Sequence, residues 1–190
     1  FFIMIRRPPR STLDRSSAAS DVYKRQDRGA IAMSAQVNLG DPAEPEMIQR
    51  MARIPTVSHE KSIPVLGMFY PRGRNLILDD SDSTSGVAHA ARLAWELGCN
   101  VVKVPWTGSE ESFGIVTTSV PIPVLVSGGP KDDDFGKVLK LVEKSINAGG
   151  SGVCMGRNVF SSEDPASRIR ALRSIVHEGA NAEEASRHLR

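Results

Sequence analysis

Short apolar runs alternate with amphipathic stretches along the chain from Gly29 onward. Five nearly continuous apolar runs predict β-strands, at residues 30–38, 63–70, 100–106, 122–128 and 152–156. Runs of this kind are typical of parallel strands that are covered on both faces, since a strand with one wet face alternates polar and apolar residues.

Between these runs, apolar residues recur at the spacing of amphipathic helices. The pattern predicts helices over about 83–97 and 133–147, a short one after Ser109, and one from Asp164-Pro165 to near Gly179. A last helix starts at Asn181, where Glu184 completes a capping-box pair. A further helix begins near Pro45, and we expect Pro55 to interrupt or restart it, because an interior proline removes a hydrogen bond.

The alternation of strand and helix predicts an α/β fold with a parallel sheet. The predicted strands begin roughly 30 residues apart on average, and a TIM (β/α)₈ barrel of roughly 250 residues uses about 31 per unit. The residues after position 26 suffice for about five such units. The spacing alone leaves two architectures open, a partial barrel and an open doubly wound sheet.

The first 26 residues, FFIMIRRPPRSTLDRSSAASDVYKRQ, have neither a helical nor a strand period. Their apolar start is too short for the core of a signal peptide. The stretches IRRPPRSTL and SDVYKRQ resemble translated sequencing-adapter read-through. We therefore expect residues 1–26 to be a non-native leader, with a genuine disordered tail as the alternative, and residues 27–190 to form the folded part.

Composition and charge narrow the classes of function. Hydrophobic residues make up 40% of the sequence and charged residues 24%, which indicates a globular domain. The formal net charge is +2 and no sustained basic block follows residue 26, which argues against nucleic acid as the main partner. No apolar run approaches the roughly 20 residues of a membrane span. Cys99 and Cys154 lie in apolar runs, and we expect buried thiols in a reducing, cytoplasmic compartment.

The ends of the predicted strands carry residues that could do chemistry. Lys103 lies inside the apolar run NVVKVPW, and a lysine is almost never fully buried unless something pairs with it or uses it. Tyr70 ends the second strand in MFYPRG, while SGGP (127–130) and GRN (156–158) follow the last two strands. In a barrel, catalytic groups lie at the C-terminal strand ends, and the loops after the last two strands often bind phosphate.

Each of these features also has a purely structural explanation. Lys103 could extend its amine to solvent, and Tyr70 could be a core ring with its hydroxyl at the rim. SGGP alone is a common strand-to-loop turn. The acidic run 132–134 is typical of a helix N-terminus rather than of a metal cluster, and the four histidines have no ligand spacing. The sequence therefore predicts no metal site.

The motifs VNLG, MFYPRG, NVVKVPWTG, VLVSGGPK and GVCMGRNVF resemble, in this order, those of the class I aldolases of the archaeal fructose-bisphosphate aldolase type and the related aminodideoxyheptulosonate synthases. The resemblance covers about residues 28–190. It implies a TIM barrel in which a strand lysine, here Lys103, forms a Schiff base with a ketose phosphate while Tyr70 acts as general acid/base. The positions that match the family's phosphate site are Ser127, Gly128, Gly129, Gly156 and Arg157.

The resemblance further implies a phosphorylated sugar as substrate, no cofactor, and a homo-oligomeric cytoplasmic enzyme. The apolar surroundings predicted for Lys103 disfavour the ammonium form, which leaves more free amine to attack a carbonyl. Fructose-bisphosphate aldolases of this type carry Trp in place of Met68 and a second Lys in place of Pro105, and the synthases are closer at both positions. The choice between aldolase and synthase therefore stays open.

The family's first three strands, including an Asp-His-Gly motif with a catalytic aspartate, have no counterpart in this sequence. We therefore expect a partial barrel of about five strands, family strands 4–8, with two open edges. Such a chain is expected to be insoluble or inactive when expressed alone, because exposed edges and apolar faces favour aggregation. A phosphosugar-binding module without catalysis remains the second alternative.

Overall fold

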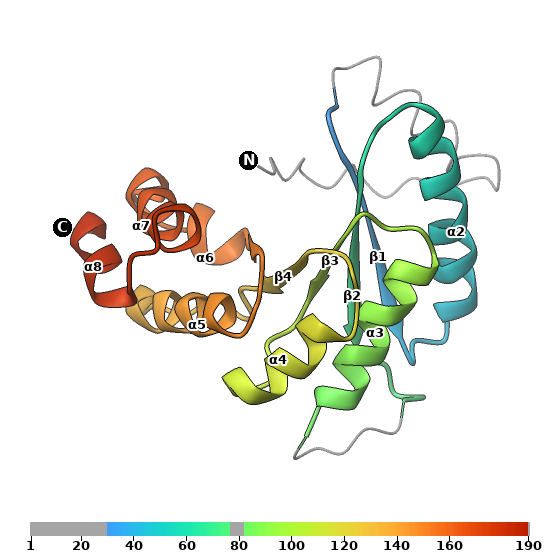
Figure 1. The fold of residues 1–190 in the computed structure, drawn as a ribbon, viewed down its shortest axis with the longest axis horizontal. Helices are drawn as coiled ribbons and strands as arrows, with labels where there is room; N and C mark the ends of the chain where they lie inside the picture. The colour runs from blue at the N-terminus through green and yellow to red at the C-terminus, as the bar shows by residue number, and fades with distance from the viewer. Residues whose placement is uncertain (1–29, 77–81, 190) are drawn as a thin grey trace.

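The computed structural model describes residues 30–76 and 82–189, so the predicted leader 1–26 lies outside the described residues. Strands and helices alternate along the chain, as predicted (Figure 1). The strands are β1 (Met33–Leu39), β2 (Val65–Pro71), β3 (Val101–Val104), β4 (Val124–Ser127) and β5 (Gly152–Cys154). The helices are α2 (Glu44–Glu60), α3 (Thr84–Glu96), α4 (Glu110–Thr118), α5 (Phe135–Asn147), α6 (Arg157–Phe160), α7 (Pro165–Glu178), α8 (Ala182–Ser186) and the 3-10 helix η1 (Arg187–Leu189).

The strands form one parallel sheet in the order β1-β2-β3-β4-β5. Each strand pairs with its sequence neighbour, so that Gly67 lies opposite Val102 and Val102 opposite Val124. A doubly wound sheet would reverse its strand order at a switch point, and the sequential order rules that alternative out. The order is that of consecutive β/α barrel units, which confirms the predicted fold class. Among the described residues, β1 and β5 are the two edges of the sheet.

One face of the sheet is covered by helices, and we call the opposite face the inner face. In β1, Met33 and Val37 are buried against the helices, whereas Ser34 and Gln36 are exposed on the inner face. Successive side chains of a strand point to opposite faces, so this alternation defines the two sides. The prediction of strands covered on both faces is therefore wrong for β1.

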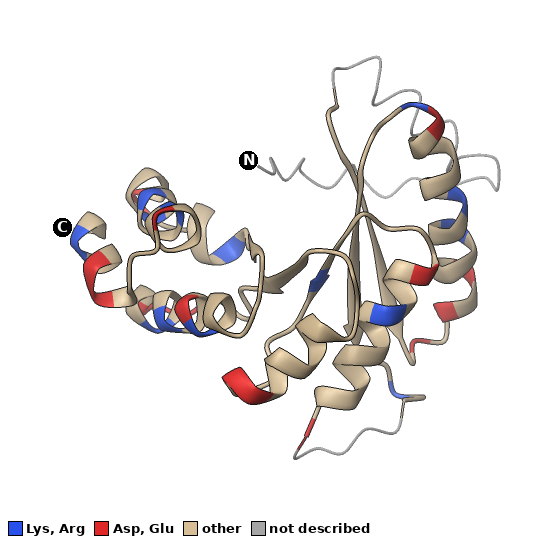
Figure 2. Cartoon of the chain, in the orientation of Figure 1, with Lys and Arg blue, Asp and Glu red and all other residues tan. Residues whose placement is uncertain are grey.

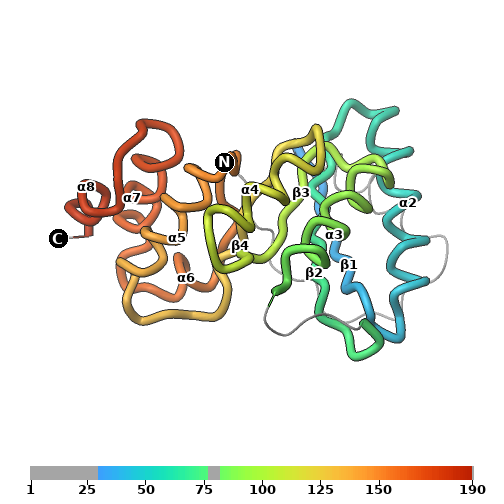
Figure 3. The backbone as a smooth tube through the Cα atoms, turned by 60° about the horizontal axis from the view of Figure 1, so that its bottom comes forward, coloured from blue at the N-terminus to red at the C-terminus, as the bar shows by residue number. Residues whose placement is uncertain are grey.

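The main core lies between the covered face and helices α2, α3 and α4, which lie side by side along the sheet (Figures 1 and 3). Among its largest fully buried side chains are Leu39, Met51 and Phe69. Burying a side chain of this size contributes about 1.5–3 kcal/mol. A slip of one residue in β1 or β2 would turn Leu39 or Phe69 to the inner face. Their burial therefore fixes the register of the strands that position the site.

Helices α5, α7 and α8 form a second apolar cluster beyond the β4–β5 side of the sheet (Figure 3). The amphipathic helix predicted over 133–147 is confirmed, since Val138, Leu139 and Val142 of α5 are buried in this cluster. Ala171 and Ile175 of α7 belong to the same cluster. This packing holds the segment after β5 against the helix that follows β4, which brings the loops after these two strands together.

The predicted helix ends agree with capping side chains. Asp164 accepts a hydrogen bond from Ser167 N at 3.0 Å at the start of α7, and Gly179 ends this helix in a left-handed conformation (φ 73°). Asn181 and Glu184 form the predicted capping box, with reciprocal bonds of 2.9 and 3.0 Å. The side chains of Asp164 and Asn181 satisfy backbone N–H groups that have no partner inside the helix.

Two features of the helices differ from the prediction. Pro55 neither interrupts nor restarts its helix, because α2 continues through it from Glu44 to Glu60. The proline is buried, and a Cβ at Gly98 would lie 3.1 Å from its Cβ, so close packing against the turn after α3 supports the helix where one hydrogen bond is missing. The short helix α6 is not predicted, since four residues cannot show a helical period.

Charged residues of both signs are interspersed along α2 and α5 (Figure 2). This mixture differs from the single-sign basic face that is typical of nucleic-acid-binding proteins. No helix in the described part of the chain is long and apolar enough to cross a membrane.

Candidate active site

Lys103 lies in the middle of β3 and faces the inner side of the sheet. Its neighbours Val102 and Val104 are fully buried against the helices, so Lys103 points the other way. Its register partners on the adjacent strands are Met68 and Leu125, which share its face. Lys103 is nevertheless only 8% exposed, which favours a lysine that takes part in chemistry over one that extends to solvent.

The surroundings of Lys103 are apolar. Leu66, Leu125 and Cys154 form a small buried cluster on the inner face, and Met68 packs against it. Burial raises the pKa of the Cys154 thiol above its ordinary value of 9.0, while the nearby Lys103 amine acts in the opposite direction through its charge and a hydrogen bond. The Cys154 thiol and the Lys103 amine therefore lie near one another, on strands that are two apart in the sheet.

Tyr70 stands at the C-terminal end of β2, two residues beyond Met68 and so on the same face. Its ring centroid lies 5.9 Å from Lys103 Nζ. The Arg72 guanidinium carbon lies 4.5 Å from the same centroid. Tyr70 and Lys103 thus converge at one end of neighbouring strands, with the tyrosine ring near the Lys103 amine and packed against the Arg72 guanidinium.

Arg72 and Asn38 were not assigned to the site from the sequence, although the structure brings them to it. Arg72 Nε donates to Asn38 Oδ1 at 3.0 Å, and Gln36 Nε2 donates to the same oxygen at 2.9 Å. Asn38 is the register partner of Tyr70 on β1. The signal that could have revealed them is the polar alternation Ser34, Gln36, Asn38, which places polar side chains on the inner face.

The loops after β4 and β5 lie together at the same end of the sheet. Ser127 is the last residue of β4 and is buried, and Gly128 and Gly129 follow it. Arg157 Nη2 donates to Gly129 O at 3.2 Å, so the β5–α6 turn contacts the β4–α5 loop directly. The predicted phosphate-site residues are therefore adjacent in space.

Several backbone N–H groups in these two loops are available for a ligand. Within residues 30–76 and 82–189, the N–H groups of Gly129, Gly156 and Arg157 donate to no acceptor in a loop or turn. Gly129 adopts a left-handed conformation (φ 63°), which a residue with a side chain rarely takes. Glycine-rich turns with unused N–H groups are a common way to hold an anion.

The two cysteines are free and buried, as predicted. Burial raises the pKa of Cys99 to about 12, and its thiol lies 3.7 Å from the sulfur of Met51 in the core. A thiol in this setting is a packing group rather than a nucleophile. Among the described residues, no group of three or more His, Cys, Asp or Glu side chains is arranged to hold a metal ion.

The sequential parallel sheet, with a buried lysine on its inner face, is the arrangement of consecutive β/α-barrel units. The chain belongs to the DeoC/LacD family of aldolases, which its residues 7–162 match. This membership confirms the resemblance inferred from the motifs.

The curated relatives include two synthases of different name. A 2-amino-4,5-dihydroxy-6-oxo-7-(phosphonooxy)heptanoate synthase of Streptomyces griseus is 37% identical over 158 residues, which cover 83% of this chain and 57% of the relative. The 2-amino-3,7-dideoxy-D-threo-hept-6-ulosonate synthase 1 of Archaeoglobus fulgidus is 40% identical over 156 residues, which cover 82% and 56%. The chain therefore spans somewhat over half the length of these relatives.

The solved structures that it resembles include archaeal aldolases. One is an archaeal fructose-1,6-bisphosphate aldolase with its catalytic Lys covalently bound to the carbinolamine intermediate of the substrate, at 33% identity and a TM-score of 0.75. The superposition covers 82% of this chain and 61% of that one. A Schiff-base-forming fructose-1,6-bisphosphate aldolase matches with 32% identity and a TM-score of 0.76, over 82% and 62%.

Proposed function

We propose that the protein carrying this sequence is a class I aldolase that makes or breaks a carbon–carbon bond of a phosphorylated ketose through an imine on Lys103. The observation that carries this proposal is the buried position of Lys103 on the inner face, beside Tyr70 and next to two loops with unused N–H groups. A lysine in apolar surroundings and without an ion-pair partner has little structural use, but its amine can act as a nucleophile.

The bond changes follow from the chemistry of an amine and a ketone. The free amine of Lys103 attacks the carbonyl carbon to give a carbinolamine, whose hydroxyl leaves as water to form a cationic imine. In the cleavage direction, the electron pair of the neighbouring carbon–carbon bond moves towards the imine, and the aldehyde product departs. Protonation of the resulting enamine and addition of water then release the ketose product and the lysine.

Tyr70 is the general acid/base of this scheme. Its hydroxyl would exchange a proton with the reacting oxygen, and general acid–base catalysis by such a group contributes about 10²–10⁴-fold to a rate. The position of Tyr70 at a strand end, with its ring 5.9 Å from the amine, supports this role. The Arg72 guanidinium packs against the same ring and so supports its position.

The phosphate of the ketose binds to the two glycine loops. Ser127, Gly128 and Gly129 supply a hydroxyl and backbone N–H groups, and Gly156 and Arg157 supply further N–H groups from the second loop. The Arg157 guanidinium adds positive charge at the same place. Binding energy from this remote group holds the carbonyl carbon near the amine.

A specific observation favours a second candidate function, transfer of the ketose carbons to an amino-acid semialdehyde. Two relatives are named as synthases, and the sequence resemblance at Met68 and Pro105 is also closer to the synthases than to the fructose-bisphosphate aldolases. Both activities use the same Lys103 imine and differ in the aldehyde that takes part. Supplying fructose 1,6-bisphosphate alone, and then with aspartate semialdehyde, separates the two, because only a synthase forms a longer aminoketose.

The class of the enzyme is tested by inactivation. We expect turnover that is unaffected by EDTA and that is lost irreversibly when borohydride is added together with dihydroxyacetone phosphate. Turnover abolished by EDTA, with no inactivation by borohydride and the ketose phosphate, would contradict the imine mechanism.

The two buried free thiols support a reducing compartment, and we propose the cytoplasm as the place of this activity.

A further inference from the structure

Asn158 follows the predicted phosphate residues Gly156 and Arg157, yet no role is assigned to it by the motifs. It lies at the first turn of α6 and is only 1% exposed. A buried amide has to satisfy two N–H donors and a carbonyl acceptor, so its partners show what it holds in place.

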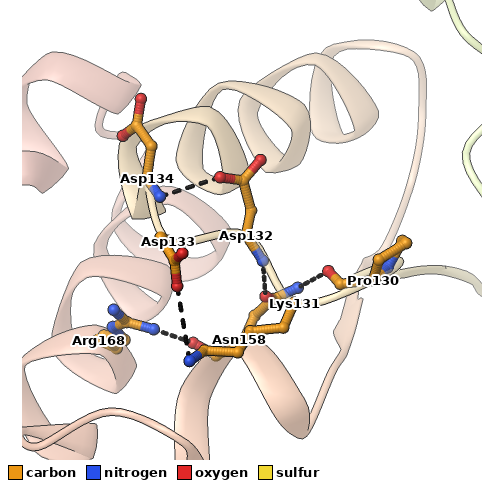
Figure 4. Close-up of polar contacts among 7 residues, drawn as sticks. All are labelled: Pro130, Lys131, Asp132, Asp133, Asp134, Asn158 and Arg168. Carbon is orange, nitrogen blue, oxygen red and sulfur yellow. Dashed lines mark hydrogen bonds and ion pairs between the residues drawn. The ribbon is translucent and has the colours of Figure 1, made fainter.

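All three hydrogen bonds of the Asn158 side chain go to the loop between β4 and α5. Nδ2 donates to Gly128 O at 2.5 Å and to Pro130 O at 3.0 Å, while Oδ1 accepts from Asp132 N at 2.9 Å. Figure 4 shows the amide lying against the loop, with the bonds to Pro130 and Asp132 drawn. One side chain therefore fixes three alternate residues of the loop.

Asn158 is itself held by a neighbour from α7. Its backbone carbonyl accepts a hydrogen bond from Arg168 Nη1 at 2.6 Å (Figure 4). The Arg168 guanidinium carbon lies 4.5 Å from the centroid of the Phe135 ring, at the first residue of α5. Arg168 of α7 therefore contacts both α5, through Phe135, and the backbone of Asn158.

The loop that Asn158 holds is the one with unused N–H groups. Gly128 has its carbonyl bonded to the amide, while the N–H group of Gly129 has no acceptor in a loop or turn of the described residues. A Cβ on Gly128 would meet Asn158 Nδ2 at 3.1 Å, which shows how closely the two loops approach. Fixing the carbonyls on one side of the loop orients the N–H groups on the other side.

We propose that Asn158 is the positioning residue of the phosphate site: it does not touch the substrate, but it sets the conformation in which the β4–α5 loop binds the phosphate of the ketose. This inference rests on the proposed function, since it concerns the phosphate end of the same substrate. It assigns to Asn158 an effect on phosphorylated substrates alone.

The test compares two ketones that differ only in the phosphate. Imine formation on Lys103 is measured by borohydride trapping and mass spectrometry, with dihydroxyacetone phosphate and with dihydroxyacetone, over a range of concentrations. The variant Asn158→Asp has the same size but replaces the two N–H donors by an acceptor that faces two carbonyl oxygens. Asn100→Ala is the matched control, because Asn100 Oδ1 also bonds a backbone N–H, that of Val65 at 2.9 Å, at the start of β2 and away from the phosphate loops.

We expect Asn158→Asp to raise the half-saturating concentration of dihydroxyacetone phosphate by about 10- to 100-fold. The change leaves two buried carbonyl oxygens without their donor and places a carboxylate beside them. Trapping by dihydroxyacetone should stay within about twofold of the original protein, and Asn100→Ala should change neither. Equal losses for both ketones, or no loss for either, would overturn the positioning role. Failure of the unmodified protein to trap either ketone would instead contradict the proposed function.

A second variant covers the case in which Asn158→Asp does not fold. Arg168→Leu leaves the Asn158 amide in place and removes the bond to its carbonyl, together with the contact between the guanidinium and the Phe135 ring. We expect the same selective loss at a smaller size, about 3- to 10-fold for the phosphorylated ketone. A loss that is the same for both ketones would contradict the proposal.

Discussion

Replacing Lys103 with methionine should abolish imine formation and at the same time stabilise the fold. The lysine is 8% exposed and forms no ion pair with any described residue. Its register neighbours Met68 and Leu125 are apolar. Methionine has a similar length and no charge, so the change removes the cost of burying a charged or strongly polar group without leaving a large cavity.

The size of the effect follows from the contacts that are lost and gained. The contact with the Tyr70 ring, at 5.9 Å, lies at the outer limit of cation–π interaction and is worth about 0.5–1 kcal/mol. Replacing buried charged groups with apolar residues of similar volume is neutral or stabilises by about 1–4 kcal/mol. We therefore expect Lys103→Met to raise the free energy of unfolding by about 1–2 kcal/mol.

Urea unfolding followed by tryptophan fluorescence measures this difference, since Trp106 packs against Phe113 at a centroid distance of 5.0 Å. Lys140→Met, on the exposed face of α5, is the control and should alter neither stability nor imine formation. A Lys103→Met variant that is less stable than the original by about 1 kcal/mol or more would refute the reasoning, because the lysine would then be a structural group.

Four further predictions concern single positions. Tyr70→Phe keeps the ring but loses the hydroxyl, so borohydride trapping should persist while the steady-state rate of carbon–carbon bond cleavage falls by about 10²-fold or more. Gly128→Ala should lower the free energy of unfolding by about 1–3 kcal/mol in urea titrations, because its Cβ would lie 2.6 Å from Met155 Cβ. Gly129→Ala, which meets nothing within 4 Å, should cost only about 1 kcal/mol of left-handed strain. Hydrogen bonds from the Ser167 hydroxyl and N–H hold the pKa of Asp164 below its ordinary value of 3.8, so its carboxylate stabilises α7 above that pH. Melting temperatures of the original protein and of Asp164→Ala should therefore differ at neutral pH and converge as the pH falls below about 3.8, and a constant difference would be inconsistent with this cap.

The sequence predicts the sheet and the central pair of the site because both depend on local patterns. Continuous apolar runs separated by amphipathic helices specify parallel strands. The last residues of parallel strands lie at the same end of the sheet. Lys103 and Tyr70 therefore converge as expected. The contact between Arg72 and Asn38 could not be read in the same way, because it joins side chains from two different strand ends whose register is set by the packed core.

Asn158 shows a second limit of sequence reasoning. Its motif neighbours are glycine and arginine, whose chemistry suggests phosphate, whereas an asparagine could serve equally as a surface residue. Its role depends on burial and on three hydrogen bonds to residues about 30 positions earlier, which only the packing of α5 against α7 brings within reach. Pro55 is a similar case, because tertiary packing outweighs a local preference.

The most direct test of the central claim is the location of the trapped adduct. The protein carrying this sequence is incubated with dihydroxyacetone phosphate, reduced with borohydride, digested and sequenced by tandem mass spectrometry. The account predicts one reduced adduct, on Lys103, that is absent from Lys103→Met and unchanged in Lys140→Met. An adduct on another lysine, or adducts scattered over the exposed lysines with none on Lys103, would contradict it.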